Sequence, residues 1–420
     1  MAKNLFLGWV ISFGLISSLC AQENASFNFE GLKRTQESYL IQFIHSMINT
    51  SPSDSLLNSN VQRLKNIASI GNASYRKDTT SQGIKITYEV EEVKTLLPIF
   101  NFGGIEGNVW FQVGFSDINW LGKGQFLSAA YQNNDRRHSG NVFYKIPRIN
   151  NTNWGFSASL NKWSSREPVF FPEGTVNYDY DNNGISLSII RNLNLNSNVE
   201  LGGTYFVENY TKSEFQFLED PPGPLGFRQP KWLAKTAYSV DRVNYHYFYL
   251  EGFAWSGVLQ GVYNTLDDDW FLSAQFQARY YARHGEKGNF ASRLRIGVAS
   301  NDDTPFAPFV ADSHTNIRGI GNRIDRGTAQ VILNTEYRHT IRENKKWGAQ
   351  IIAFSDTGTW RNPGGQLKDL VNPSQFRQFI GGGFRVIYNK VFGAIFRVDY
   401  GIDIFNKDQK GLVIGFGQYF

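Results

Sequence analysis

Hydrophobic and polar residues alternate over most of this 420-residue chain, from about residue 95 to the C-terminus. The alternation runs in segments of about ten residues, the length of a membrane barrel strand, separated by breaks rich in Asn, Gly and Asp. Because successive side chains of a strand point to opposite faces, each segment predicts one apolar and one polar face. In the clearest segment, 271–283, Leu272, Ala274, Phe276, Ala278, Tyr280 and Ala282 alternate with Ser273, Gln275, Gln277, Arg279 and Arg283.

Counting back from the C-terminus gives about sixteen segments, and an even number suits a closed antiparallel barrel. The first spans 96–103 and the last 411–420, and long breaks fall at 164–183, 211–230, 304–327 and 359–376. A soluble sandwich would also alternate, but here one face is as apolar as lipid requires while the other repeatedly carries Arg and Asp. We therefore predict a mainly β fold, a 16-stranded antiparallel transmembrane β-barrel over residues 95–420. The residues expected to line its lumen include Arg279, Arg283, Arg293, Arg295 and Arg397.

Residues 26–93 follow a different pattern. A short alternating stretch is followed by two segments with helical spacing, the first carrying Tyr39, Leu40, Phe43, Ile44 and Met47 after a capping Thr35. Two further alternating stretches complete the order strand, helix, helix, strand, strand. Helices of this length cannot bury their apolar faces alone, so we expect them to pack on one side of a small sheet. The pattern predicts a small α+β (βααββ) domain, and no residue in it suggests chemistry.

The first 22 residues have the pattern of a signal peptide: Lys3, an apolar run from Leu5 to Leu19, and then "SSLCAQ". The run is shorter than the roughly 20 apolar residues that span a bilayer. Cleavage near Ala21 is expected, and acylation of Cys20 as in a lipoprotein is the alternative. Since Cys20 is the only cysteine and lies in this segment, the mature chain is expected to have no disulfide and no thiolate site. If the chain enters a membrane, it must do so as strands.

Composition agrees with a membrane barrel and excludes several other classes. Aromatic residues make up 15% of the chain although its mean hydropathy is −0.35, because lipid-facing and lumen-facing residues cancel in the average. The net charge of +5 contains no basic block of the kind that binds nucleic acid. The chain has no G-x-S-x-G, H-E-x-x-H or P-loop motif, and its six histidines are scattered. We therefore expect the protein not to be an enzyme and to have no cofactor and no metal site. "LDDDW" at 266–270 is either a calcium ligand set or a solvated connection between strands.

Several stretches resemble the bacterial outer-membrane assembly-factor family of the BamA and TamA proteins. "EGLKRT", the two helices and "KITYEVEE" resemble one POTRA module, and "VWFQVGFSDINWLGKGQ" (109–125) resembles an early barrel strand and its turn. "IRGI" (317–320) is similar to the family's V-R-G-F/Y loop motif, and "NTEYR" (334–338) and "FSDTGTW" (354–360) are similar to the strands that follow it. The resemblance covers nearly all of the mature chain and implies one POTRA module before a sixteen-stranded barrel.

In this family the loop folds back into the lumen and its arginine meets carboxylates on the next strands. For this chain the resemblance implies the motif Ile317, Arg318, Gly319 and Ile320, with Glu336 and Asp356 as partners of Arg318. The alternation in 329–338 independently places Glu336 on the inward face. A guanidinium suits this role because its planar fork of donors matches carboxylates. The alternative is a solvated surface loop with incidental arginines.

The resemblance implies a factor in the outer membrane, with its POTRA domain in the periplasm, that inserts β-barrel proteins or helps proteins cross. Its partners would be outer-membrane lipids, unfolded barrel or secreted substrates, and periplasmic chaperones or accessory lipoproteins. The first and last strands must close the barrel, so Pro98, Phe100, Phe102, Gly415 and Phe420 are expected at a lateral seam. Pro98 either weakens this seam, because proline cannot donate a ladder hydrogen bond, or simply starts the strand. The alternative function is a secretion pore for one exported partner.

Overall fold

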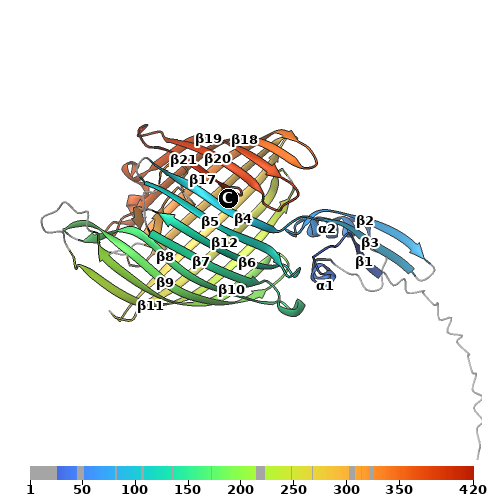
Figure 1. Ribbon diagram of the computed structural model, residues 1–420, viewed down its shortest axis with the longest axis horizontal. Helices are drawn as coiled ribbons and strands as arrows, with labels where there is room; N and C mark the ends of the chain where they lie inside the picture. The colour runs from blue at the N-terminus through green and yellow to red at the C-terminus, as the bar shows by residue number, and fades with distance from the viewer. Residues whose placement is uncertain are drawn as a thin grey trace, which may run out of the picture.

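The computed structural model describes residues 26–44, 52–80, 83–105, 108–134, 137–171, 173–213, 223–246, 248–266, 268–301, 308–313, 315–321 and 325–420. The expected signal peptide, residues 1–22, lies outside these ranges. The described chain forms a small sheet with helices, called here the N-terminal domain (residues 26–93), beside one end of a large barrel (Figure 1). None of the helices in these ranges is long and apolar enough to cross a membrane.

The N-terminal domain has the expected order of elements. Its three strands, β1 (Ser26–Glu30), β2 (Ile70–Thr80) and β3 (Gly83–Glu92), form a sheet in the order β1-β3-β2, with β1 parallel to β3. Helix α2 (Asp54–Lys65) is capped by Ser53, and its Leu57 and Leu64 join Tyr88 in a buried core.

The first helix of this domain is shorter than expected. It consists of α1 (Glu37–Leu40) and the 3-10 turn η1 (Ile41–Phe43), and Met47 falls outside the described residues. Thr35 does not cap it. Gln36 is the N-cap residue, and the Thr35 hydroxyl instead donates to Ser69 (3.2 Å) and accepts from the Asn119 amide (2.9 Å).

The barrel is closed and antiparallel, with sixteen strands, as predicted. Its order around the ring follows the sequence from β4 to β14, continues through β17 to β21, and returns to β4. The strands are β4 (Leu96–Ile105), β5 (Asn108–Trp120), β6 (Gln125–Asn134), β7 (Arg137–Ile146), β8 (Trp154–Phe171), β9 (Gly174–Asn192), β10 (Ser197–Lys212), β11 (Gly226–Tyr245), β12 (Leu250–Asn264), β13 (Asp269–His284), β14 (Gly288–Ala299), β17 (Ala329–Glu343), β18 (Trp347–Arg361), β19 (Arg377–Tyr388), β20 (Ile395–Asp403) and β21 (Lys410–Phe416).

The two ends of the barrel differ in their connections. The chain enters β4 from the N-terminal domain, so the turns β5–β6, β7–β8, β9–β10, β11–β12, β13–β14, β17–β18 and β19–β20 lie at the domain-side end. The remaining connections lie at the distal end. The 3-10 turns η3 (Leu367–Val371) and η4 (Pro373–Gln375) belong to the β18–β19 connection there, and η2 (Ile149–Asn151) belongs to β7–β8 at the domain side. The N-terminal domain therefore approaches the end with short turns.

Two expected boundaries were wrong. The predicted break at 164–183 is mostly strand, because β8 continues to Phe171 and β9 begins at Gly174. Its alternating aromatic residues extend the wall beyond the barrel body, where Tyr178 packs against Tyr210 and Phe227. The last strand ends at Phe416 rather than residue 420. Gly417 has a φ of +86°, a backbone conformation that favours glycine, and it turns the last residues out of the sheet.

We expect the outward face of the wall to lie against lipid, and β8 offers a matched pair to test this. Leu160 points outward and is 57% exposed, whereas Asn161 points inward and bonds Ser159. Leu160→Arg should destabilise the folded barrel by roughly 2–4 kcal/mol, because a cation on the lipid face loses its hydration. Urea unfolding in lipid vesicles measures this. Asn161→Arg, one residue away on the lumen face, should cost much less, and equal costs would contradict the assigned faces.

Candidate functional site

The connection between β14 and β17 returns into the barrel. It contains a small hairpin of β15 (Phe309–Ala311) and β16 (Asp325–Gly327), and the segment 315–321 carries Arg318 to the inner wall. The Arg318 side chain is fully buried. Its Nε and Nη2 donate to the two oxygens of Asp356 (2.8 and 2.9 Å), and Nη1 donates to Glu336 (2.6 Å). The backbone N–H of Arg318 also donates to Asp356 (2.9 Å).

All three nitrogens of the Arg318 guanidinium donate hydrogen bonds to carboxylates. Two parallel bonds to one carboxylate are the strong arrangement for arginine, and a lysine could not reproduce them. The residues expected from the loop motif, Arg318 with Glu336 and Asp356, are therefore in direct contact. Asp356 makes more bonds to Arg318 than Glu336 does, although the sequence pattern supported Glu336 more strongly.

Further charged residues extend the pair into a network. Arg338 donates to Glu336 through Nε (2.5 Å), and Arg385 forms two bonds with Asp399 (2.7 and 3.0 Å). Asp399 lies 4.0 Å from Arg318. Since these side chains are buried, each charge depends on the opposite charges around it rather than on water. The network joins β17, β18, β19 and β20 on the inner wall.

The C-terminal tail, residues 417–420, closes over this network. The Tyr419 ring lies 4.5 Å from the Arg318 guanidinium, and the Phe354 ring lies 3.8 Å from it. The Tyr419 hydroxyl donates to the carbonyl of Ser313 in the loop (3.2 Å). Aromatic faces stabilise a guanidinium that has lost its hydration, so the tail and the loop hold each other.

Three glycines let the loop backbone lie directly on the wall. Gly319 has a φ of +97°, and a Cβ there would lie 2.8 Å from the carbonyl oxygen of Gly401 in β20. A Cβ on Gly401 would lie 2.5 Å from the Arg318 carbonyl oxygen, and one on Gly411 in β21 would lie 2.8 Å from the Gly319 carbonyl oxygen. Any larger residue at these positions would push the loop away. The loop tip therefore rests on the last two strands of the barrel.

The isoleucines of the motif provide its apolar anchor. Ile317 is fully buried in a cluster with Ile332, Trp360 and Phe379, and Ile320 packs against this cluster. An aromatic residue, which the related motif prefers in place of Ile320, is therefore not needed for an apolar contact here.

The expected lumen arginines fall into three groups. Arg293 and Arg295 hold the loop: Arg293 donates to the carbonyl of Thr315 (2.5 Å), and Arg295 donates to Asn316 (2.8 Å). Arg397 lies 3.5 Å from Asp399, inside the charged network. Arg279 lies 3.8 Å from Asp241 nearer the domain-side mouth, and Arg283 is at the rim, where it donates to the Tyr249 hydroxyl (3.0 Å).

The seam between β21 and β4 is short. It joins Leu412–Gly415 to Asn101–Gly104 in four residue pairs, whereas β4 and β5 are joined by ten and β20 and β21 by seven. Phe102 and Gly415 lie in the seam as expected, but Pro98 and Phe100 pair only with β5. The expectation for Phe420 was wrong. Its carbonyl accepts from Arg338 (3.0 Å) inside the barrel, because the chain leaves the sheet at Gly417.

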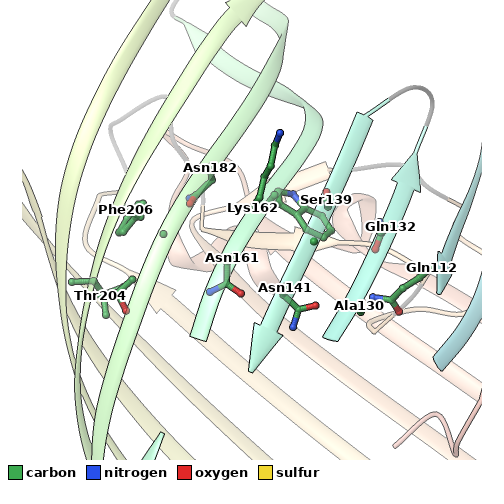
Figure 2. Close-up of a pocket in the computed structure, with 14 residues that line it drawn as sticks. Gln112, Ala130, Gln132, Ser139, Asn141, Asn161, Lys162, Asn182, Thr204 and Phe206 are labelled. Carbon is green, nitrogen blue, oxygen red and sulfur yellow. The ribbon is translucent and has the colours of Figure 1, made fainter. Parts of the chain in front are cut away.

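The wall opposite the charged network carries amides and hydroxyls together with ion pairs such as Lys231–Glu208 and Lys235–Glu200. It encloses a cavity of about 460 Å³ lined by side chains from β5 to β11. Figure 2 shows Asn141, Asn161, Asn182 and Thr204 on these strands, with Lys162 pointing away from Asn161. The lumen therefore has amides, hydroxyls and ion pairs on one side and the anchored loop on the other.

The family of this chain follows from its match to a protein-family model. The model described as the Omp85 superfamily domain matches residues 119–420 of this chain. The chain belongs to the Omp85 superfamily. A search of curated proteins finds no match.

Solved structures with the same fold share little sequence with this Omp85 chain. BamA from Haemophilus ducreyi lacking POTRA domains 1–3 is 15% identical with a TM-score of 0.53, and the match covers 94% of this chain and 84% of that one. CdiB from Acinetobacter baumannii is 13% identical (TM-score 0.57, 94% and 74% covered), and CdiB from Escherichia coli is 8% identical (TM-score 0.60, 94% and 77% covered). At these identities the likeness shows the fold alone.

Sequence reasoning missed three important residues of the site. Arg385, Asp399 and Tyr419 complete the network around Arg318. Asp399 could have been found from the alternation in 392–404, where Arg397, Asp399 and Asp403 share one face. Tyr419 could not, because the alternation near the C-terminus predicts a strand through residue 420.

Arg318→Ala should lower the free energy of unfolding by roughly 3–5 kcal/mol, because it removes the cation paired with buried Asp356 and leaves Glu336 with Arg338 alone. Arg318→Lys should recover only part of the loss, since an ammonium cannot make the two parallel bonds. Urea unfolding of the folded barrel measures both. Arg342→Ala, at an exposed arginine of β17, is the control and should change stability by less than about 0.5 kcal/mol. Similar losses in the two alanine variants would contradict the assigned role.

Proposed function

We propose that this Omp85 protein inserts β-barrel proteins into the bacterial outer membrane, or helps them cross it, by opening the seam between β21 and β4. The observation that carries this proposal is the seam itself, which has four residue pairs in a barrel whose neighbouring strand pairs have seven and ten. Each lost pair removes ladder hydrogen bonds, so this is the boundary at which the wall separates most easily.

An open seam exposes strand edges with unpaired N–H and C=O groups. An incoming strand can pair with such an edge by β-augmentation, which requires no covalent chemistry and accepts many sequences. The lumen loop supports this mechanism from inside, because Gly319 rests on β20 and β21 and Tyr419 joins the tail to the loop. The wall can then open at one place while β17 to β20 stay tied to Arg318.

The N-terminal domain fits the role of a single POTRA module in the periplasm. Its β2 strand lies at the edge of the sheet order β1-β3-β2, so its outer side is available for a further strand. An unfolded substrate could pair there before it reaches the barrel. Under this proposal the domain-side turns face the periplasm, and chaperones or accessory lipoproteins would act on the same side.

A secretion pore for one exported protein is the second candidate. The cavity of about 460 Å³ and its amide-lined wall favour it, because uncharged polar side chains can line a path for an extended chain. Arg293 and Arg295 hold the loop across the lumen, so this function would require the loop to move. The similarity to both BamA and CdiB structures does not choose between the two functions.

Depletion of the protein in its native cell separates the two functions. We expect the abundance of many outer-membrane barrel proteins to fall together, because an insertase serves a class of substrates. Quantitative proteomics of the outer membrane measures this. Loss of one secreted protein with the other barrels unchanged would overturn insertion in favour of the dedicated pore.

A disulfide across the seam should abolish insertion if the seam must open. Phe102 and Ile414 are opposite each other in the β4–β21 pair, and the chain has no cysteine except Cys20 in the expected signal peptide. The pair Phe102→Cys and Ile414→Cys should therefore support growth only under reducing conditions. Leu294→Cys with Leu333→Cys, opposite each other on β14 and β17, is the matched control and should have no effect. Full activity of the oxidised seam variant would rule out the lateral mechanism.

A further inference from the structure

The turn between β5 and β6 is bonded closely to the N-terminal domain. Asp117, near the end of β5, is buried and accepts three hydrogen bonds: from Arg34 Nη2 (2.7 Å), from the Thr95 hydroxyl (2.7 Å) and from the Asn119 backbone N–H (3.0 Å). Arg34 belongs to the domain, and Thr95 directly precedes β4. One carboxylate therefore joins the domain, the start of the first barrel strand and the second strand.

Asn119 and the glycines after it complete this contact. The Asn119 amide donates to the Thr35 hydroxyl (2.9 Å) and its oxygen accepts from the N–H of Gly124 (2.8 Å). The Gln36 N–H donates to the Gly122 carbonyl (2.8 Å). Gly122 has a φ of +72°, and a Cβ there would lie 2.0 Å from the Arg34 carbonyl oxygen. In the segment "DINWLGKG" (117–124), the Asn119 amide bonds the domain, and the absence of a side chain at Gly122 lets the domain backbone lie against the turn.

The Tyr39 ring packs against the same turn. A Cβ on Gly124 would lie 2.1 Å from the Tyr39 ring, so the ring packs directly on the turn. Burial there raises the pKa of the Tyr39 phenol to about 12.

A second contact joins the end of the domain and the linker residue Lys94 to the turn between β19 and β20. The Lys94 N–H donates to the Lys390 carbonyl (3.0 Å), and the Phe392 N–H donates to the Lys94 carbonyl (2.9 Å). Glu91 and Lys390 form an ion pair beside these backbone bonds. Lys94 and Val391 form an isolated parallel β-bridge.

These two contacts lie on opposite sides of the seam. In the ring of strands, β4 and β5 are on one side of the β21–β4 boundary, and β19, β20 and β21 are on the other. A third contact, in which Asn66 donates to Asn244 (3.0 Å) and accepts from the Tyr245 N–H (3.1 Å), lies at the β11–β12 turn, far around the ring.

We infer that the N-terminal domain, with the linker residue Lys94, is a bracket across the seam that holds Asp117 and Asn119 on one side and Lys390 and Phe392 on the other. The domain has its own buried core, including Leu57, Leu64 and Tyr88, so it transmits force as a unit. Separating β4 from β21 at the domain-side end then requires one of the two contacts to break, in addition to the four residue pairs of the seam.

Because the domain lies outside the barrel wall, binding events at the domain can change how easily the seam opens. A partner that binds the domain more tightly when one contact is released favours the open seam. The free energy of opening then falls by the difference between the partner's binding free energies for the two states. The inference does not depend on whether the substrate is inserted or secreted, because it concerns only the coupling between the domain and the seam.

Arg34→Glu tests the first contact, because it places a second carboxylate beside buried Asp117. The readout is hydrogen–deuterium exchange by mass spectrometry on the full chain in lipid nanodiscs. Exchange in 101–104 and 412–415 should become about tenfold faster, since local opening of a strand pair sets the exchange rate of its amides. Exchange in β12 and β13 should stay at the wild-type rate.

A disulfide tests the second contact in the opposite direction. Lys94→Cys with Val391→Cys joins the two residues of this bridge, and bridged residues lie roughly 5 Å apart, which suits a disulfide. The oxidised variant should exchange more slowly than its reduced form in the seam segments.

Asn66→Ala is the matched control, since it releases the domain from the β11–β12 turn without touching either side of the seam. Exchange in the seam should then match the wild type. Three results would overturn the bracket: wild-type seam exchange in Arg34→Glu, equal acceleration of all strands in that variant, or acceleration of the seam by Asn66→Ala. No readout involves activity, so failure of the proposed function would leave this test unaffected.

Discussion

The buried charge of Arg318 is the constraint on which the lumen depends. A guanidinium removed from water is costly unless carboxylates surround it, and the barrel supplies them from adjacent strands: Glu336 from β17, Asp356 from β18 and, more distantly, Asp399 from β20. Each of these carboxylates is neutralised by Arg318 or by another arginine. This one side chain must reach the inner wall. The path of the loop, the glycines beneath it and the inward turn of the C-terminal tail all make that possible.

The barrel combines a firm wall with one weak boundary. On the side of Arg318, the charged network holds four strands and the loop together. At the seam only four residue pairs close the ring, and support comes from elements outside the sheet: the loop tip at Gly319, the tail at Tyr419 and the N-terminal domain at the domain-side end. Because these supports are separate from the strand pairs, they can be released without unfolding the rest of the barrel.

The low identity to BamA and CdiB structures is understandable in the same terms. A barrel wall needs only the alternation of apolar and polar residues, which many sequences satisfy, so 8–15% identity is compatible with TM-scores of 0.53–0.60. The loop has stricter demands, because a planar fork of donors, a positive φ at Gly319 and small residues at Gly401 and Gly411 must coincide.

The sequence by itself determined the elements with a local cause. Period two in 271–283 and 329–338 specified strands and their faces, and helical spacing specified the helix that the structure shows as α2. The inward position of Glu336 followed from the same alternation. The tertiary structure decided which distant groups meet: Asp399 beside Arg318, Tyr419 under the loop, Phe420 inside the barrel rather than in the seam, and Asp117 against Arg34. Alternation records only which face a side chain occupies, whereas these contacts depend on strand register, on the turn at Gly417 and on the closure of the ring, none of which is encoded within a single segment.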